Sequence, residues 1–124
     1  MSHPNLTLVK SLALKPLFTV LRATSTPPCL FITIAKRIHR ILVEEALATL
    51  PSTPLDVLTP CGTYSGCEIT CLKSGKVAAI SIIRAGDSLL ESVREILPDV
   101  RVGKILIQRD ESTALPVSEY GSDE

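Results

Sequence analysis

Residues 77–116 decide the fold, and they read VAAISIIRAGDSLLESVREILPDVRVGKILIQRDESTALP. The stretch opens with an unbroken apolar run over residues 77–83, which is typical of a strand covered on both faces. Leucine, valine and isoleucine then recur at helical spacing over residues 89–97, until Pro98 ends the pattern. A second apolar run follows at residues 102–107. Strand, loop, helix and strand in this order predict a parallel βαβ unit.

Arginines stand where each of the two predicted strands ends. Arg84, Ala85 and Gly86 follow the first strand, and Arg109 ends the second. Because the strands of a right-handed βαβ unit point the same way, their carboxyl ends meet at one ligand-binding edge of the sheet. Two guanidinium groups and a glycine turn before a helix N-terminus suit phosphate, so we predict an anion site here. The alternative is that each arginine only marks where a buried strand meets water.

Outside this stretch, the sequence pattern predicts, in chain order, an extended arm, a helix, a β-hairpin and a C-terminal tail. We expect residues 1–23 to form an extended arm, because Pro16 interrupts their pattern. Residues 24–50 repeat apolar side chains every three or four positions and predict the longest helix. Residues 55–76 hold two strand-like runs around a turn-rich segment, which predicts a β-hairpin. The tail at residues 117–124 is expected to fray.

Two finer expectations concern the hairpin and the helix of the βαβ unit. The hairpin strands are expected at residues 55–58 and 68–72, on either side of a turn at residues 59–66. Asp87 or Ser88 is expected to cap the helix that follows the first strand of the βαβ unit.

The composition limits the classes of function. The 124 residues carry 13 lysines and arginines against 13 aspartates and glutamates, so the formal charge is zero. That balance argues against a general nucleic-acid surface and against a polybasic membrane anchor. No apolar run reaches the roughly 18 residues that span a bilayer, and the N-terminus resembles no signal peptide. We therefore expect a single cytoplasmic domain that acts on neither nucleic acid nor membrane.

Four cysteines fit a reduced setting, and they are Cys29, Cys61, Cys67 and Cys71. Five residues separate the second from the third and three separate the third from the fourth, unlike the paired knuckles of a zinc site. The two histidines, His3 and His39, lie far from them in sequence. We expect ordinary thiols, with no disulfide and no protein-bound metal.

Two blocks of this sequence resemble the uracil phosphoribosyltransferase family, in its eukaryotic, fungal-type form. They are VAAISIIRAG at residues 77–86 and VRVGKILIQRDESTALP at residues 100–116. The resemblance implies a type I phosphoribosyltransferase-like, Rossmann-like α/β fold around the βαβ core. It also implies a glycosyltransferase of pyrimidine salvage, which joins uracil to phosphoribosyl diphosphate (PRPP) and releases UMP and diphosphate.

The resemblance gives roles to the residues of the predicted anion site. Arg84, with the turn at Ala85 and Gly86, matches the family's contact to the diphosphate of PRPP. Arg109 matches the residue that stabilises the negative charge of that diphosphate, and Mg²⁺ is implied as the ion that accompanies PRPP. No residue of this chain is assigned a catalytic step.

The resemblance also implies partners outside the anion site. Some family members bind an activating GTP with basic residues of a block that matches residues 37–46. Arg40 in this block and Arg101 outside it stand at matching positions, which makes them candidate GTP ligands. Hairpin arms serve dimer contacts in the family, so a homo-oligomer is implied. An apolar strand edge left without a neighbour further predicts association, aggregation or marginal stability.

The resemblance covers about the first half of the family's domain. The later half carries a phosphate-binding loop with adjacent glycines and a segment that recognises uracil. No two of the six glycines of this sequence are adjacent, and neither segment is found. We therefore expect a truncated domain, and whether it catalyses the reaction stays open. The alternatives are a non-catalytic module that binds nucleotide or PRPP or that dimerises, and a remnant without a ligand.

Overall fold

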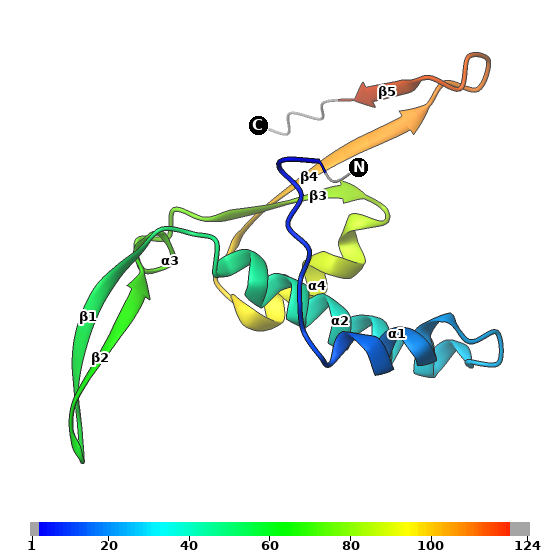
Figure 1. Cartoon of the computed structure of the whole chain (residues 1–124). Helices are drawn as coiled ribbons and strands as arrows, with labels where there is room; N and C mark the ends of the chain where they lie inside the picture. Colours follow the sequence, from blue (N-terminus) through cyan, green and yellow to red (C-terminus); the bar gives the residue numbers. More distant parts are fainter. Residues whose placement is uncertain (1–2, 120–124) are drawn as a thin grey trace. The chain divides into compact units, whose positions relative to one another are not determined.

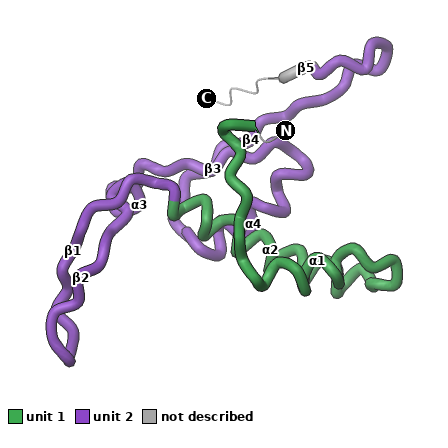
Figure 2. Tube along the Cα trace, viewed as in Figure 1, with its two compact units in different colours: residues 1–48 green, residues 49–124 purple. Residues whose placement is uncertain are grey.

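The computed structural model describes residues 3–119 and divides into two compact units. Unit 1 is Met1–Ala48 and unit 2 is Thr49–Glu124 (Figure 2). The single domain expected from the sequence stays a prediction, because this division describes compact units of the chain. Within residues 3–119, every helix is too short or too polar to cross a lipid bilayer.

Unit 1 consists of two packed helices, α1 at Leu14–Arg22 and α2 at Pro28–Leu47 (Figure 1). The long helix was expected at residues 24–50, and it begins where Pro28 takes its first position. Proline suits that position because its fixed φ matches the helix and its missing N–H has no partner there anyway. Leu17 of α1 and Ile34 and Val43 of α2 are buried.

Helix α1 contradicts the prediction of an extended arm over residues 1–23. Pro16 was taken as a break, but it is the third residue of α1. The first four N–H groups of a helix have no acceptor inside it, so a proline there removes no hydrogen bond. The Arg22 guanidinium lies over the Phe18 ring at 5.8 Å from its centre, one turn further along α1.

The hairpin of unit 2 has longer strands than predicted. Strand β1 is Ser52–Thr59 and strand β2 is Gly62–Ile69, antiparallel and joined by a two-residue turn. Much of the segment expected as a turn therefore lies in β2, because each of its residues pairs with one of β1. A Cβ on Gly66 would lie 2.9 Å from Cε1 of Tyr64, so the tyrosine ring covers this glycine. Helix α3, Thr70–Lys73, replaces the end of the second predicted strand.

The parallel βαβ unit is confirmed. Strand β3 is Ala78–Ile83, helix α4 is Gly86–Ile96 and strand β4 is Arg101–Arg109. The two strands are parallel, in a register that runs from Ala78 opposite Arg101 to Ile83 opposite Leu106. Strand β5, Pro116–Glu119, pairs antiparallel with β4 and gives the order β3-β4-β5. The predicted tail thus begins as a strand, and residues 120–124 lie outside the described part.

The two faces of β3 differ in what covers them. Helix α4 packs on β3, and buried Ser81 marks the face that it covers (Figure 1). Leu90 supplies the buried leucine of α4. On the other face, Ile80 and Ile82 remain exposed over 65% and 52% of their surface. The sheet of unit 2 therefore has one covered and one uncovered face.

Candidate functional site

The register of the parallel pair brings both predicted arginines to one edge of the sheet. Ile83 is the last residue of β3 and lies opposite Leu106. Arg84 comes one residue after this pair, and Arg109 comes three residues after it on β4. Both arginines are exposed. At about 3.3 Å per residue, Arg109 lies roughly 7 Å further along the strand direction than Arg84. Long guanidinium side chains can bridge such an offset around one bound anion.

Arg84 and Ala85 form the turn that leads directly into α4. The peptide bond between Ile83 and Arg84 is cis. The N–H of Asp87 donates to the carbonyl of Arg84 at 3.1 Å, and the Ser88 hydroxyl donates to the carbonyl of Ala85 at 2.9 Å. Ala85 is the N-cap, without a side-chain cap bond, so the predicted capping by Asp87 or Ser88 was wrong.

Gly86 is the point where the turn touches the sheet. A Cβ at this position would lie 2.7 Å from Oγ of Ser81 and 3.4 Å from its Cα. Ser81 is only 3% exposed, so it has little room to move away. The missing side chain of glycine therefore allows the first turn of α4 to approach β3 closely.

A polar network joins the start of α4 to both parallel strands. The Ser81 hydroxyl of β3 donates to Oδ1 of Asp87 at 2.8 Å, and Nζ of Lys104 on β4 lies 3.1 Å from Oδ2 of the same carboxylate. The hydrogen bond from Ser81, followed by that from Lys104, lowers the pKa of Asp87 from its ordinary value of 3.8. Three elements are thus fixed to one another beside the turn at Arg84.

This geometry favours a negatively charged ligand. The N-terminus of α4 presents the positive end of the helix dipole at the same edge as Arg84 and Arg109. The Asp87 carboxylate would repel an anion there, but its pairing with Lys104 offsets that charge. Neither Ser81 nor Lys104 was predicted to belong to the site. The signal was a serine inside an apolar run with a glycine five residues later.

Asp110, immediately after Arg109, orders the loop between β4 and β5. Its Oδ1 accepts four hydrogen bonds, from the backbone N–H and the hydroxyl of both Ser112 and Thr113, at 2.6–3.0 Å. These bonds hold the pKa of Asp110 well below its ordinary value, the Ser112 hydroxyl being the largest cause. An aspartate with serine and threonine two and three residues later is a turn signal from which this loop could have been predicted.

The candidate GTP residues lie in different units. Arg40 is an exposed residue of α2 in unit 1, and Arg101 is the exposed first residue of β4 in unit 2. Arg101 stands at the end of β4 opposite to Arg109. A shared GTP site therefore stays a prediction.

The described residues do not form a protein-held metal site. Within residues 3–119, no three histidine, cysteine, aspartate or glutamate side chains gather closely enough to bind an ion. Asp87 and Asp110, the carboxylates nearest the candidate site in sequence, are already engaged by hydrogen-bond donors. The four cysteines are free thiols.

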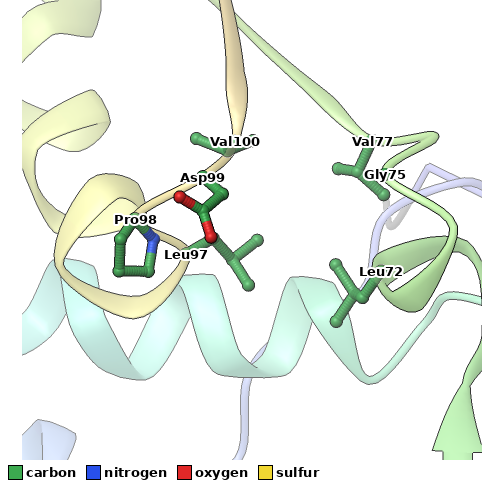
Figure 3. A pocket seen from close by; sticks show the side chains of 7 residues that line it. All are labelled: Leu72, Gly75, Val77, Leu97, Pro98, Asp99 and Val100. Atoms are coloured by element: carbon green, nitrogen blue, oxygen red, sulfur yellow. The ribbon is translucent and has the colours of Figure 1, made fainter.

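A cavity of about 190 Å³ lies beside the amino ends of β3 and β4, whereas the candidate site lies at their carboxyl ends (Figure 3). Val77 precedes β3 and Val100 precedes β4, so the cavity sits at the amino ends of the parallel strands. Asp99 is the one carboxylate among its lining residues, which are Leu72, Gly75, Val77, Leu97, Pro98, Asp99 and Val100. This mainly apolar cavity does not include the two arginines of the candidate site.

Comparison with known proteins identifies the family. The family model described as "Uracil phosphoribosyltransferase" matches residues 8–122. The chain belongs to the uracil phosphoribosyltransferase family. Uracil phosphoribosyltransferase of Dictyostelium discoideum is 42% identical over 119 residues, which are 94% of this chain and 53% of that protein. Uracil phosphoribosyltransferase 1 of Schizosaccharomyces pombe is 44% identical over 86% of this chain and 48% of its own length.

The chain spans about half the length of the curated uracil phosphoribosyltransferases it matches, and it corresponds to their N-terminal half. A solved structure of a protein from Aquifex aeolicus has a similar fold, with a TM-score of 0.65 and 24% sequence identity. The match covers 92% of this chain and 53% of that structure. The α/β fold with its parallel core is therefore shared with a known structure.

Proposed function

We propose that this chain supplies the diphosphate-binding half of a uracil phosphoribosyltransferase, the enzyme that converts uracil and PRPP to UMP and diphosphate in pyrimidine salvage. Arg84, Ala85 and Gly86 would hold the diphosphate of PRPP, and Arg109 would stabilise the charge that develops as it leaves. The observation that supports the proposal is that both arginines lie at the same edge of the sheet. Arg84 follows β3 and Arg109 ends its parallel neighbour β4, beside the N-terminus of α4.

The contribution of these residues is binding and positioning. The bond between ribose and diphosphate breaks while the uracil nitrogen bonds to the ribose carbon and loses its proton, so negative charge grows on the diphosphate. Arginines fixed at the edge of a rigid sheet stabilise that charge without moving. The Ser81–Asp87–Lys104 network supports the proposal because it holds the turn at Arg84 against both strands.

Mg²⁺ would enter as part of the PRPP complex. Magnesium is commonly held by substrate phosphates and water with few protein ligands, which fits a site whose nearest carboxylates have other partners. No chemical step is assigned to a protein-bound ion. GTP as an activator, with Arg40 and Arg101 as ligands, remains a further proposal. The four free cysteines are compatible with the cytoplasm that we propose as its location.

A second candidate is a module that binds PRPP or nucleotide without catalysis. The observation in its favour is that both arginines and the N-terminus of α4 suit the binding of an anion, while no residue beside them is assigned a chemical step. The same arginines would bind the same diphosphate in both cases. The candidates differ only in whether product forms.

The experiment is to incubate the purified chain with PRPP, Mg²⁺ and radiolabelled uracil and to separate UMP by chromatography. UMP formation that is lost in Arg109→Ala and kept in Arg94→Ala would establish the enzyme. Arg94 is the control because it lies in the last turn of α4, at the end opposite to the turn at Arg84, although its charge contributes to lowering the pKa of Asp87. PRPP binding without UMP would favour the module. Neither binding nor product would refute both.

A further inference from the structure

Unit 1 contains an apolar groove between its two helices. The volume of the groove is about 390 Å³, within the roughly 300–1,000 Å³ of most sites for small molecules. Leu8 and Leu42 in its wall are exposed over 71% and 44% of their surface, so the groove is open to water. A hydrocarbon chain that entered it would release that water. Every lining residue is hydrophobic, and they include Leu8 and Val9 before α1, Leu14 and Phe18 of α1, and Ile38 and Leu42 of α2.

Two cations of α1 lie beside this groove. Lys15 and Arg22, both exposed, line a second hollow together with Phe18, and Phe18 also lines the groove. The Arg22 guanidinium lies 5.8 Å from the centre of the Phe18 ring. The positive charge of Arg22 is therefore held next to the wall of the apolar groove, and the two hollows share the phenylalanine ring.

The charge of unit 1 favours an anion at these two cations. The first acidic residue of the chain is Glu44, and residues 1–43 carry six lysines and arginines. Residues 1–48 have six basic against two acidic side chains, a formal charge of +4, and residues 49–124 have seven against eleven, a charge of −4. The zero net charge of the whole chain thus conceals a positive unit 1, whose field attracts an anion.

We propose that unit 1 binds a single-chain anionic lipid, a long-chain carboxylate. The hydrocarbon chain lies in the groove, and the carboxylate is paired with Lys15 and Arg22 beside the Phe18 ring. The proposed diphosphate site is built from residues of unit 2, so this lipid site goes beyond the proposed function and stands without it.

The combination of an apolar groove with adjacent cations favours this ligand over two simpler ones. The phosphates of a nucleotide would also pair with the cations, but its sugar and base would lose their water in a groove lined by apolar side chains. An uncharged hydrocarbon would fill the groove and gain nothing from Lys15 and Arg22. A chain that ends in a carboxylate uses both features.

The test is isothermal titration of the full chain with octanoate, decanoate and dodecanoate, each below its micelle-forming concentration. We expect one molecule bound per chain, with an affinity that rises about fourfold for each added methylene group. Decyltrimethylammonium, which has a chain of the same length and the opposite charge, should bind at least about tenfold more weakly than decanoate.

Two pairs of variants separate the contribution of the groove from that of the cations. Leu42→Gln should weaken decanoate binding about fivefold or more, whereas Leu30→Gln should leave it unchanged. Leu30 is the matched control because it is a leucine of the same helix, is 40% exposed and lies outside the groove lining. Lys15→Gln/Arg22→Gln should weaken binding about fivefold or more and remove the preference for decanoate over the ammonium.

Arg37→Gln is the control for the loss of charge. Arg37 is an exposed arginine of α2 that lines neither hollow, so its variant should bind decanoate as the wild-type protein does. All the substituted residues are exposed, and circular dichroism should show that the variants keep their helices.

Three results would overturn the proposal. One is the absence of saturable decanoate binding, or equal affinity for decanoate and decyltrimethylammonium. Another is co-sedimentation with vesicles of anionic phospholipid without binding of monomeric decanoate, which would make unit 1 a membrane-surface module. The third is a dimer of this chain that Leu42→Gln dissociates and that excludes decanoate. None of these measurements uses PRPP or uracil, so their outcome is independent of the proposed function.

Discussion

Replacing Gly86 with alanine tests how closely the turn at the candidate site must approach the sheet. The new Cβ would lie 2.7 Å from Oγ of Ser81, closer than any ordinary contact. The serine hydroxyl cannot rotate away freely, because it is 3% exposed and donates to Asp87. Helix α4 or strand β3 must therefore shift, which costs about 1–3 kcal/mol for an overpacked site.

A smaller gain opposes this cost. Alanine lowers the conformational entropy of the unfolded chain, which stabilises a protein by about 0.4–1 kcal/mol where the backbone tolerates it. The net expectation is a loss of about 1–2 kcal/mol, or a fall in melting temperature of about 4–8 °C for a chain of this size. Differential scanning fluorimetry and urea unfolding of Gly86→Ala against wild type measure it.

The control is Gly103→Ala, the same substitution on β4. Its nearest neighbour would be Cγ1 of Ile80 at 3.6 Å, an ordinary contact, so this variant should be as stable as wild type or more so. In the double variant with Ser81→Ala, the 2.7 Å contact is gone and Gly86→Ala should lose most of its cost. A Gly86→Ala protein as stable as the Gly103→Ala protein would refute the reasoning.

Further predictions concern the core, the dependence of stability on pH, and the loop after Arg109. Leu90→Ala removes the buried leucine of α4 and should cost about 2–5 kcal/mol in urea unfolding; a loss under 1 kcal/mol would mean that α4 is not packed as described. The pKa values of Asp87 and Asp110 are lowered by folding, so their stabilisation is present above their ordinary value of 3.8 and is lost as the pH falls below it. Between pH 7 and pH 2, the melting temperature of the double variant Asp87→Asn/Asp110→Asn should fall less steeply than that of the wild-type protein. Parallel curves of melting temperature against pH for the two proteins would contradict this. Asp110→Ala removes four hydrogen bonds, so amide hydrogen exchange at residues 112 and 113 should become faster, and unchanged exchange would mean that the loop is ordered otherwise.

The parallel core was predictable because its signals are local. An unbroken apolar run, a glycine turn, a helical repeat ended by Pro98 and a second apolar run leave few other arrangements. The same logic failed in α1, because a proline within the first turn of a helix looks in sequence like a proline that breaks it. It also failed in β2, where glycine and serine suggested a turn although cross-strand pairing with β1 makes a strand.

At the candidate site, the sequence predicted which groups meet but not what holds them. Arg84, Gly86 and Arg109 could be assigned to one edge because parallel strands end together. The link from Ser81 to Asp87 and on to Lys104 depends on side chains 6 and 17 residues apart in sequence. Such a contact follows from the strand register, and the register is known only from the structure.

The central claim is that Arg84 binds the diphosphate of PRPP at the edge it shares with Arg109. Isothermal titration of the chain with PRPP and Mg²⁺ tests it most directly, with Arg84→Ala and the control Arg94→Ala side by side. Hydrogen bonds to a charged group contribute about 1.5–3 kcal/mol, so Arg84→Ala should weaken binding about 10- to 150-fold while Arg94→Ala matches wild type. Equal affinity of Arg84→Ala and wild type for PRPP would contradict the claim.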